Sequence, residues 1–222
     1  YSRESRLVDM SRNTTVLALA SSVFGEERYG KQGATFVKHL FLDKDTSIAP
    51  RVIFYSSINK NALREWAHMF DGMRLLHKNG YLSDNEMKEL RDWFYDFHSY
   101  MISEKQGVSQ YYTHGSKGIW YDTENAALSA FVLDGMMFMN HTVRAQSRLL
   151  DGTISSTTTK VEDLVPWYIL GTMAERAGID YFTYQTKDSI CVLEEASMGI
   201  SNTNPLFYYA ATHYTSIEKK IQ

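Results

Sequence analysis

The sequence has a single cysteine, Cys191, among 222 residues, so no disulfide can form within the chain. Helical spacing around Cys191 predicts a buried structural thiol. The histidines are scattered, and none has the spacing of a metal-ligand pair. We therefore expect neither a metal site nor a cofactor.

Proline and long apolar runs are also scarce. There are three prolines, and no long segment alternates polar and apolar residues with the two-residue period of a strand. These absences favour a mostly helical fold. No run of about 18 apolar residues exists, so we expect no transmembrane helix. No signal peptide is visible, and the chain begins at Tyr1 without a methionine, which is consistent with processing.

A surplus of positive charge is absent as well. The net charge is −3 and the isoelectric point is about 6.2, which argues against a nucleic-acid surface. An acidic chain still binds an anionic sugar if its cleft is locally basic. Tyrosine is plentiful, with 15 residues, and its ring both stacks on sugars and fills helix–helix interfaces. The tyrosines therefore fit a carbohydrate cleft and a helical core equally well.

Apolar residues recur at helical spacing along most of the chain. Ser83 and Glu86 have the spacing of a capping box, while Gly25 and Gly178 are expected to end helices. Asp163 is expected to cap a helix that has Pro166 in its first turn. Loops are predicted over residues 43–59, 107–118 and 154–159, and helices over residues 7–24, 26–42, 61–78, 84–103, 120–133, 136–150, 163–177, 187–198 and 205–219.

Helices of this length, joined in antiparallel pairs, predict an all-α fold of stacked hairpins. Such hairpins form either a solenoid or a closed toroid, and no internal repeat decides between the two. No linker-like segment interrupts the sequence, so residues 1–222 are predicted to form one domain.

The segment 115–122 is the most informative part of the chain. It runs from a polar loop into a helix whose apolar face follows at Ala126, Ala127, Ala130 and Phe131. Trp120 and Tyr121 beside Asp122 at a helix entrance are typical of a sugar-binding cleft. The same residues also fit a packed helix whose first turn carries a carboxylate stabilised by the helix dipole.

Several segments together resemble the alginate lyase superfamily of polysaccharide lyases: residues 15–29, 41–50, 90–94, 118–122 and 174–182. Their order and spacing carry the resemblance, which covers most of the chain. The resemblance implies an (α/α) toroid and β-elimination of a uronate-containing polysaccharide such as alginate. The beginning of the family's domain is expected to be missing before Tyr1, which leaves open an incomplete toroid.

The chain departs from this family at the residues that carry the chemistry. Alignment on Trp120-Tyr121-Asp122 without a gap places Ser116 and Lys117 where the family has its catalytic Asn and His. A shifted loop instead brings residues 113–115, Thr-His-Gly, to that position. The family's later passage with an Arg and a catalytic Tyr corresponds to residues 153–162, which contain neither residue type.

The resemblance nonetheless suggests a set of site residues. Lys117 is a candidate to neutralise a uronate carboxylate, and His114 and Tyr121 are candidates to move protons. Each also fits a structural role, as a solvated loop residue or a helix-packing residue. The predicted substrate-binding residues are Tyr112, Trp120, Asp122 and Arg144, and Arg148 and Gln146 are further candidates to contact an anion.

Two functions remain open from the sequence: an active polysaccharide lyase, and a catalytically inactive lyase-fold protein that binds glycans or serves structural assembly. A helical scaffold with a coincidental resemblance is a third, less favoured interpretation. The expected partner is an acidic polysaccharide, with no nucleic acid or membrane, and an oligomeric or assembly partner is left open. Asn13 and Asn140 begin N-x-[ST] sequons and hint at a secreted protein.

Overall fold

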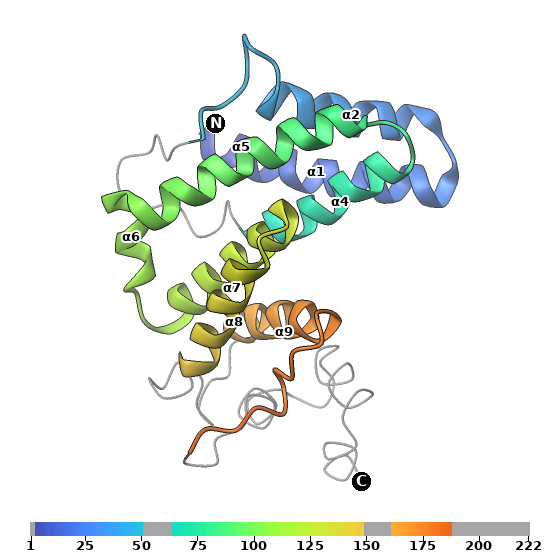
Figure 1. Cartoon of the computed structure of the whole chain (residues 1–222). Coiled ribbons are helices and arrows are strands. Elements are labelled where there is room, and N and C mark those ends of the chain that lie inside the picture. The colour runs from blue at the N-terminus through green and yellow to red at the C-terminus, as the bar shows by residue number, and fades with distance from the viewer. Residues whose placement is uncertain (1–2, 51–63, 149–160, 188–222) are drawn as a thin grey trace, which may run out of the picture. The chain divides into compact units, whose positions relative to one another are not determined.

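The computed structural model describes residues 3–50, 64–148 and 161–187, which are helical with no β-strand among them (Figure 1). The chain divides into two compact units. The first unit contains residues 1–112 and 127–138, and the second contains residues 113–126 and 139–222. The single domain predicted from the sequence stays a prediction, and each unit is described by itself.

Five helices belong to the first unit, and four of them, α1, α2, α4 and α5, lie alongside one another (Figure 1). Helix α1 packs against both α2 and α4. Gly25 has a φ of +69° and ends α1, as predicted. Gly30 in α2 lies directly under the ring of Tyr81, where a Cβ atom would overlap it. The helices are α1 (Arg3–Phe24), α2 (Glu27–Phe41), α4 (Trp66–Lys78), α5 (Asp84–Ser103) and α6 (Lys105–Tyr111).

An aromatic cluster forms the core of the first unit. Phe94 of α5 is at its centre and is fully buried. Its ring centroid lies 4.9 Å from those of Phe41 and Phe70 and 5.4 Å from those of Trp66 and Phe131, in tilted or edge-to-face arrangements. These are the geometries that aromatic rings prefer, and each pair contributes beyond the burial of its surface. The apolar stripes seen in the sequence therefore meet in one core.

The predicted capping box opens α5. The Ser83 hydroxyl accepts a hydrogen bond from the Glu86 backbone N–H, and the Glu86 carboxylate accepts one from the Ser83 N–H. Burial alone raises the pKa of Glu86, but hydrogen bonds from Lys38 and Ser83 outweigh it and hold that pKa below its ordinary value. Glu86 therefore joins α2 to the start of α5 as a carboxylate at neutral pH.

The loop predicted over residues 107–118 is wrong over most of its length. Residues 105–111 form α6, and α7 (Gly115–Val132) begins five residues before the predicted start at Trp120. Gly107 is buried with its Cα against the backbone of Met101, so its lack of a side chain permits close packing rather than flexibility. The sequence predicted a loop here because glycine disfavours a helix, and the packing of Gly107 against Met101 is not visible in the sequence.

The second unit is built on the first half of α7, most of α8 (Gly135–Ser147) and α9 (Val161–Arg176), and α8 turns back alongside α7 (Figure 1). Helix α9 begins two residues before the predicted cap Asp163, so Pro166 lies beyond its first turn. Gly178, with a φ of +77°, follows its end as predicted. Trp167 and Tyr168 of α9 pack on the rings of Tyr181 and Phe182.

Several predictions fall on residues outside the described ranges. They are the helices over 187–198 and 205–219, the loop over 154–159, the buried thiol of Cys191, and the first residues of the helix predicted over 61–78. The structure describes residues 43–50 of the connection predicted over 43–59, and this part contains turns as expected for a connection. Among the described helices, none combines the length and hydropathy needed to cross a bilayer.

Candidate functional site

The second unit contains a buried cluster of charged side chains centred on Asp122 of α7. Asp122 is 0% exposed, and its two carboxylate oxygens bind different arginines from the α8 segment. Arg144 donates from Nη2 to Oδ1, and Arg148 donates from Nε to Oδ2 at 2.5 Å. The formal charge of these three side chains is +1. A carboxylate buried in this way requires such partners, because an unpaired charge inside a protein is strongly unfavourable.

Helical spacing explains why one carboxylate collects these partners. His141, Arg144 and Arg148 follow one another at three and four residues, so they share one face at the end of α8. That face meets the face of α7 that carries Asp122. His141 Nδ1 lies 3.6 Å from Asp122 Oδ1, the same carboxylate oxygen that Arg144 binds. The cluster therefore joins α7 and α8 through charge rather than through apolar packing alone.

Gly118 allows Arg148 to reach the loop in front of α7. The Arg148 Nη1 group donates a hydrogen bond of 2.8 Å to the Thr113 carbonyl oxygen. A Cβ atom at residue 118 would overlap both that Nη1 atom and the Thr113 oxygen. Glycine is therefore required sterically at this position, which is the Gly of the motif that resembles the lyase family.

His141 is a buried neutral histidine. Burial lowers its pKa to about 4, and the positive charge of Arg148 acts in the same direction. Asp122 lies close enough to attract a proton onto the ring, but two guanidinium groups already compensate its charge. The ring of Tyr121 lies 6.0 Å away, edge to face. His141 is therefore uncharged at neutral pH and is packed as part of the interior.

We predict that the second unit loses stability in mild acid because of His141. An unfolded histidine has a pKa of about 6.5, so between pH 6.5 and 4 the unfolded chain binds a proton that the folded chain does not. The free energy of unfolding should fall by about 1.4 kcal/mol per pH unit in that window. Urea denaturation at pH 7 and pH 5 measures this slope, and His141→Gln should reduce it.

The exposed His39 supplies the matched control for this titration. His39→Gln should leave the pH slope as it is in the wild type, because this side chain lies at the surface, whereas His141 is transferred from the interior to water on unfolding. Equal slopes for the wild type and His141→Gln would contradict the prediction.

Trp120 and Tyr121, predicted to line a sugar cleft, are both buried. The guanidinium carbon of Arg144 lies 5.0 Å from the Tyr121 ring centroid, in cation–π geometry. Asp122 has no exposed surface, whereas the Arg144 side chain is 16% exposed. The structure therefore brings Tyr121, Asp122 and Arg144 together as an interior group, with Arg144 nearest to solvent.

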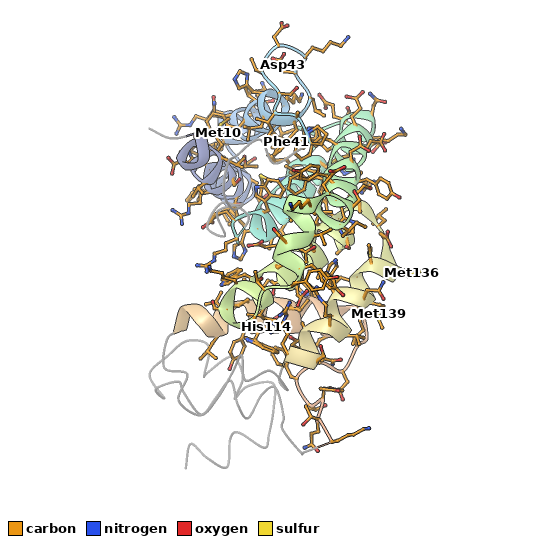
Figure 2. All side chains as sticks on the ribbon, turned by 90° about the vertical axis from the view of Figure 1, so that its left-hand side faces the viewer. Met10, Phe41, Asp43, His114, Met136 and Met139 are labelled. Carbon is orange, nitrogen blue, oxygen red and sulfur yellow. The ribbon has the colours of Figure 1, made fainter. Side chains whose placement is uncertain are left out.

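His114, Lys117 and Tyr112 have a different environment, since all three are exposed. His114 lies where the chain enters α7 (Figure 2), directly before Gly115, whose φ is +67°. Lys117 follows in the first turn of α7. Tyr112 belongs to the first unit, is 70% exposed, and pairs edge to face with Tyr111 at 5.1 Å between ring centroids. The predicted catalytic residues thus divide into two accessible side chains, His114 and Lys117, and the buried Tyr121.

A separate hollow lies between α1 and α4 in the first unit. Its lining is mostly apolar and includes Leu19 and Leu75, with His68 and Lys78 near them. It holds none of the predicted site residues. The residues that resemble the lyase motif, not this hollow, therefore define the candidate site.

Sequence reasoning missed two members of the buried cluster, His141 and Gly118. His141 was seen only as the middle of the Asn140 sequon, although its spacing to Arg144 and Arg148 was visible as a helical stripe. Gly118 was taken as part of a loop. Its role depends on Arg148, which is 30 positions later in the chain, and no local pattern reveals that contact.

Comparison with known proteins identifies the family and the fold of this chain. A family model described as alginate lyase matches residues 1–156. Among solved structures, the chain is similar to a crystal structure of an alginate lyase from Bacteroides ovatus, with 19% identity and a TM-score of 0.77. The match covers 86% of this chain and 56% of that chain, so this chain spans little more than half the length of that structure. No curated protein matches the sequence. The predicted all-α fold of the (α/α) toroid class is confirmed.

Proposed function

Because the chain belongs to the alginate lyase family, we propose that it binds an acidic, uronate-containing polysaccharide such as alginate at the start of α7 and cleaves it by β-elimination. The observation that carries the proposal is the exposure of His114 and Lys117 together at this helix entrance. A lysine ammonium and the free backbone N–H groups of a helix N-terminus both favour an anion, here the C6 carboxylate of a uronate.

The reaction breaks the C5–H and C4–O4 bonds and forms a C4=C5 double bond. His114 accepts the C5 proton as a general base and returns a proton to O4, which departs as a hydroxyl group. Lys117 compensates the negative charge that builds up on the C6 carboxylate as the proton leaves. It does so as a point charge, without the planar geometry of an arginine.

The remaining candidate residues take supporting roles in this proposal. Tyr112, in the first unit, has an exposed ring and stays a predicted sugar contact, whereas Arg144, in the second unit, is less buried than Arg148. Tyr121 is a second proton-transfer group only if its buried ring becomes accessible to the polymer. Trp120 and Asp122 are too buried to contact a ligand, so we assign them a structural role in the helix that carries Lys117.

A turnover assay tests this proposal. The protein is incubated with alginate, polymannuronate and glucuronan, and the far-ultraviolet absorbance of the unsaturated product is followed. We expect His114→Gln to lower kcat by about 10²-fold or more, because a positioned acid–base group contributes 10²–10⁴-fold. Lys117→Met should reduce both kcat and kcat/KM, because the ammonium compensates charge that develops in the transition state. Lys88→Met, at an exposed lysine of α5, is the matched control and should behave as the wild type.

A second candidate function is glycan binding without turnover. It is favoured by Ser116 and Lys117 at the positions of the family's catalytic pair and by the absence of Arg and Tyr from residues 153–162. A pull-down on immobilised alginate separates the two. Binding that Lys117→Met weakens, without any unsaturated product, supports this second function. Absence of both binding and product for all three polymers contradicts both functions.

A secreted location belongs to the same proposal. Asn13 and Asn140, the acceptor positions of both sequons, are exposed. If the chain passes through a eukaryotic secretory route, glycosidase treatment of the purified protein should reduce its apparent mass, and Asn13→Gln with Asn140→Gln should abolish that change.

A further inference from the structure

We infer that Arg148 is a positioning residue, which together with Gly118 sets the conformation of the Thr113–His114–Gly115 turn. The inference rests on the proposed function in one respect, namely that His114 acts on the polymer. Arg148 is in the described part of the chain directly after α8, and the turn is directly before α7. No sequence motif joins the two, so the contact is a property of the tertiary structure.

The first observation is the double use of the guanidinium. Arg148 Nε binds Asp122 Oδ2 at 2.5 Å, and Nη1 of the same group binds the Thr113 carbonyl at 2.8 Å. The side chain is buried, at 7% exposed, so water competes little for either bond. The planar fork of an arginine supplies donors in two fixed directions, which a lysine does not. Asp122 thus orients Arg148, and Arg148 holds the backbone of Thr113.

The second observation is steric and independent of the first. Gly118 leaves open the space in which the Arg148 Nη1 group meets the Thr113 oxygen, and any Cβ atom there would overlap both. The turn itself needs Gly115 in a left-handed conformation, with a φ of +67°. Two glycines therefore flank the contact, one to form the turn and one to admit the guanidinium.

The consequence falls on His114, the residue between the held carbonyl and the left-handed glycine. With the Thr113 carbonyl held on one side and α7 beginning at Gly115 on the other, the backbone from which the imidazole projects has little freedom. A reacting group must be placed accurately, since a shift of about 1 Å lowers the rate roughly 10²-fold. Arg148 thereby acts on the reaction through the backbone of the turn, without contact with the polymer.

Gly118→Ala tests the inference, and Gly135→Ala is its matched control. Both residues are in helices and neither has a positive φ, but nothing lies within 4 Å of a Cβ atom built at Gly135. Alanine is favoured over glycine in a helix, so the purely local effect should be destabilising at neither position. We expect Gly118→Ala alone to raise amide hydrogen exchange at His114 and Gly115 and to lower kcat/KM by about 10²-fold. Arg148→Lys, which keeps the charge beside Asp122, should show the same exchange pattern.

The outcomes separate this inference from the proposed function. Wild-type exchange at His114 and Gly115 in both Gly118→Ala and Arg148→Lys overturns the inference, whatever the activity. Faster exchange with unchanged kcat/KM in an active enzyme also overturns it, because the turn would then not position a working group. A wild type without activity or polymer binding overturns the proposed function alone, since exchange still tests the contact. Faster exchange confined to the turn, in a Gly118→Ala variant that melts at the same temperature as Gly135→Ala, supports Arg148 as a positioning residue.

Discussion

Asp122→Asn should destabilise the second unit by about 3–5 kcal/mol, the usual effect of removing one member of a buried ion pair. The substitution keeps the size of the side chain but leaves Arg144 and Arg148 without the carboxylate that both bind. Two guanidinium groups then share a buried site with the neutral His141. Because whole domains have only about 5–15 kcal/mol of stability, this change should leave the unit marginally folded. Urea denaturation at neutral pH measures the effect.

Asp71 provides the comparison for Asp122. It pairs with Arg74 at 2.9 Å, but its side chain is 67% exposed, and solvent screens the attraction. Asp71→Asn should therefore change the free energy of unfolding by less than about 1 kcal/mol. A similarly small effect at both positions would show that the Asp122 cluster does not hold the second unit together.

Phe94→Ala should have an effect of comparable size on the first unit, about 3–5 kcal/mol for truncation of a buried Phe. Phe94 is at the centre of the aromatic cluster, and its ring contacts Phe41, Trp66, Phe70 and Phe131. Rings held by helices on several sides cannot collapse into the space that alanine leaves, so most of the cavity should remain. The measurement is the free energy of unfolding from a denaturant titration.

The next residue along the chain serves as the control. Tyr95 is 53% exposed on the same helix, so Tyr95→Ala should change the stability by no more than about 0.5 kcal/mol. If Phe94→Ala and Tyr95→Ala had equal effects, the loss would come from the propensity of α5 itself rather than from the packed cluster.

The helices that were predicted well from the sequence are those whose signals are local. Helix α5 begins at its capping box and carries a continuous apolar stripe, so both its start and its buried face followed from the residues. Gly25 and Gly178 ended helices as expected, because a left-handed residue after a helix is a local requirement. The boundaries failed where glycines serve close packing, as Gly107 does against the backbone of Met101 and Gly118 does against the side chain of Arg148.

The candidate site shows the same division. The motif around Trp120-Tyr121-Asp122 was visible in the sequence, and so was its resemblance to a family that the comparisons then showed. Asp122, however, was expected at a helix entrance near solvent. It is well inside α7, because the helix begins at Gly115, and its carboxylate binds Arg144 and Arg148. That His141 is a buried neutral histidine beside Asp122 became visible only in the tertiary structure.

The sequence by itself determined the all-α class, most of the helices, and the family to which the chain belongs. These properties depend on periodicity, caps and ordered motifs, which neighbouring residues carry. Only the tertiary structure decided that Trp120, Tyr121 and Asp122 are interior while His114 and Lys117 are exposed. It alone joined Arg148 to Gly118 and Thr113, because that contact depends on how α8 packs against α7. Burial and charge pairing are set by residues far apart in the chain, and no local pattern contains them.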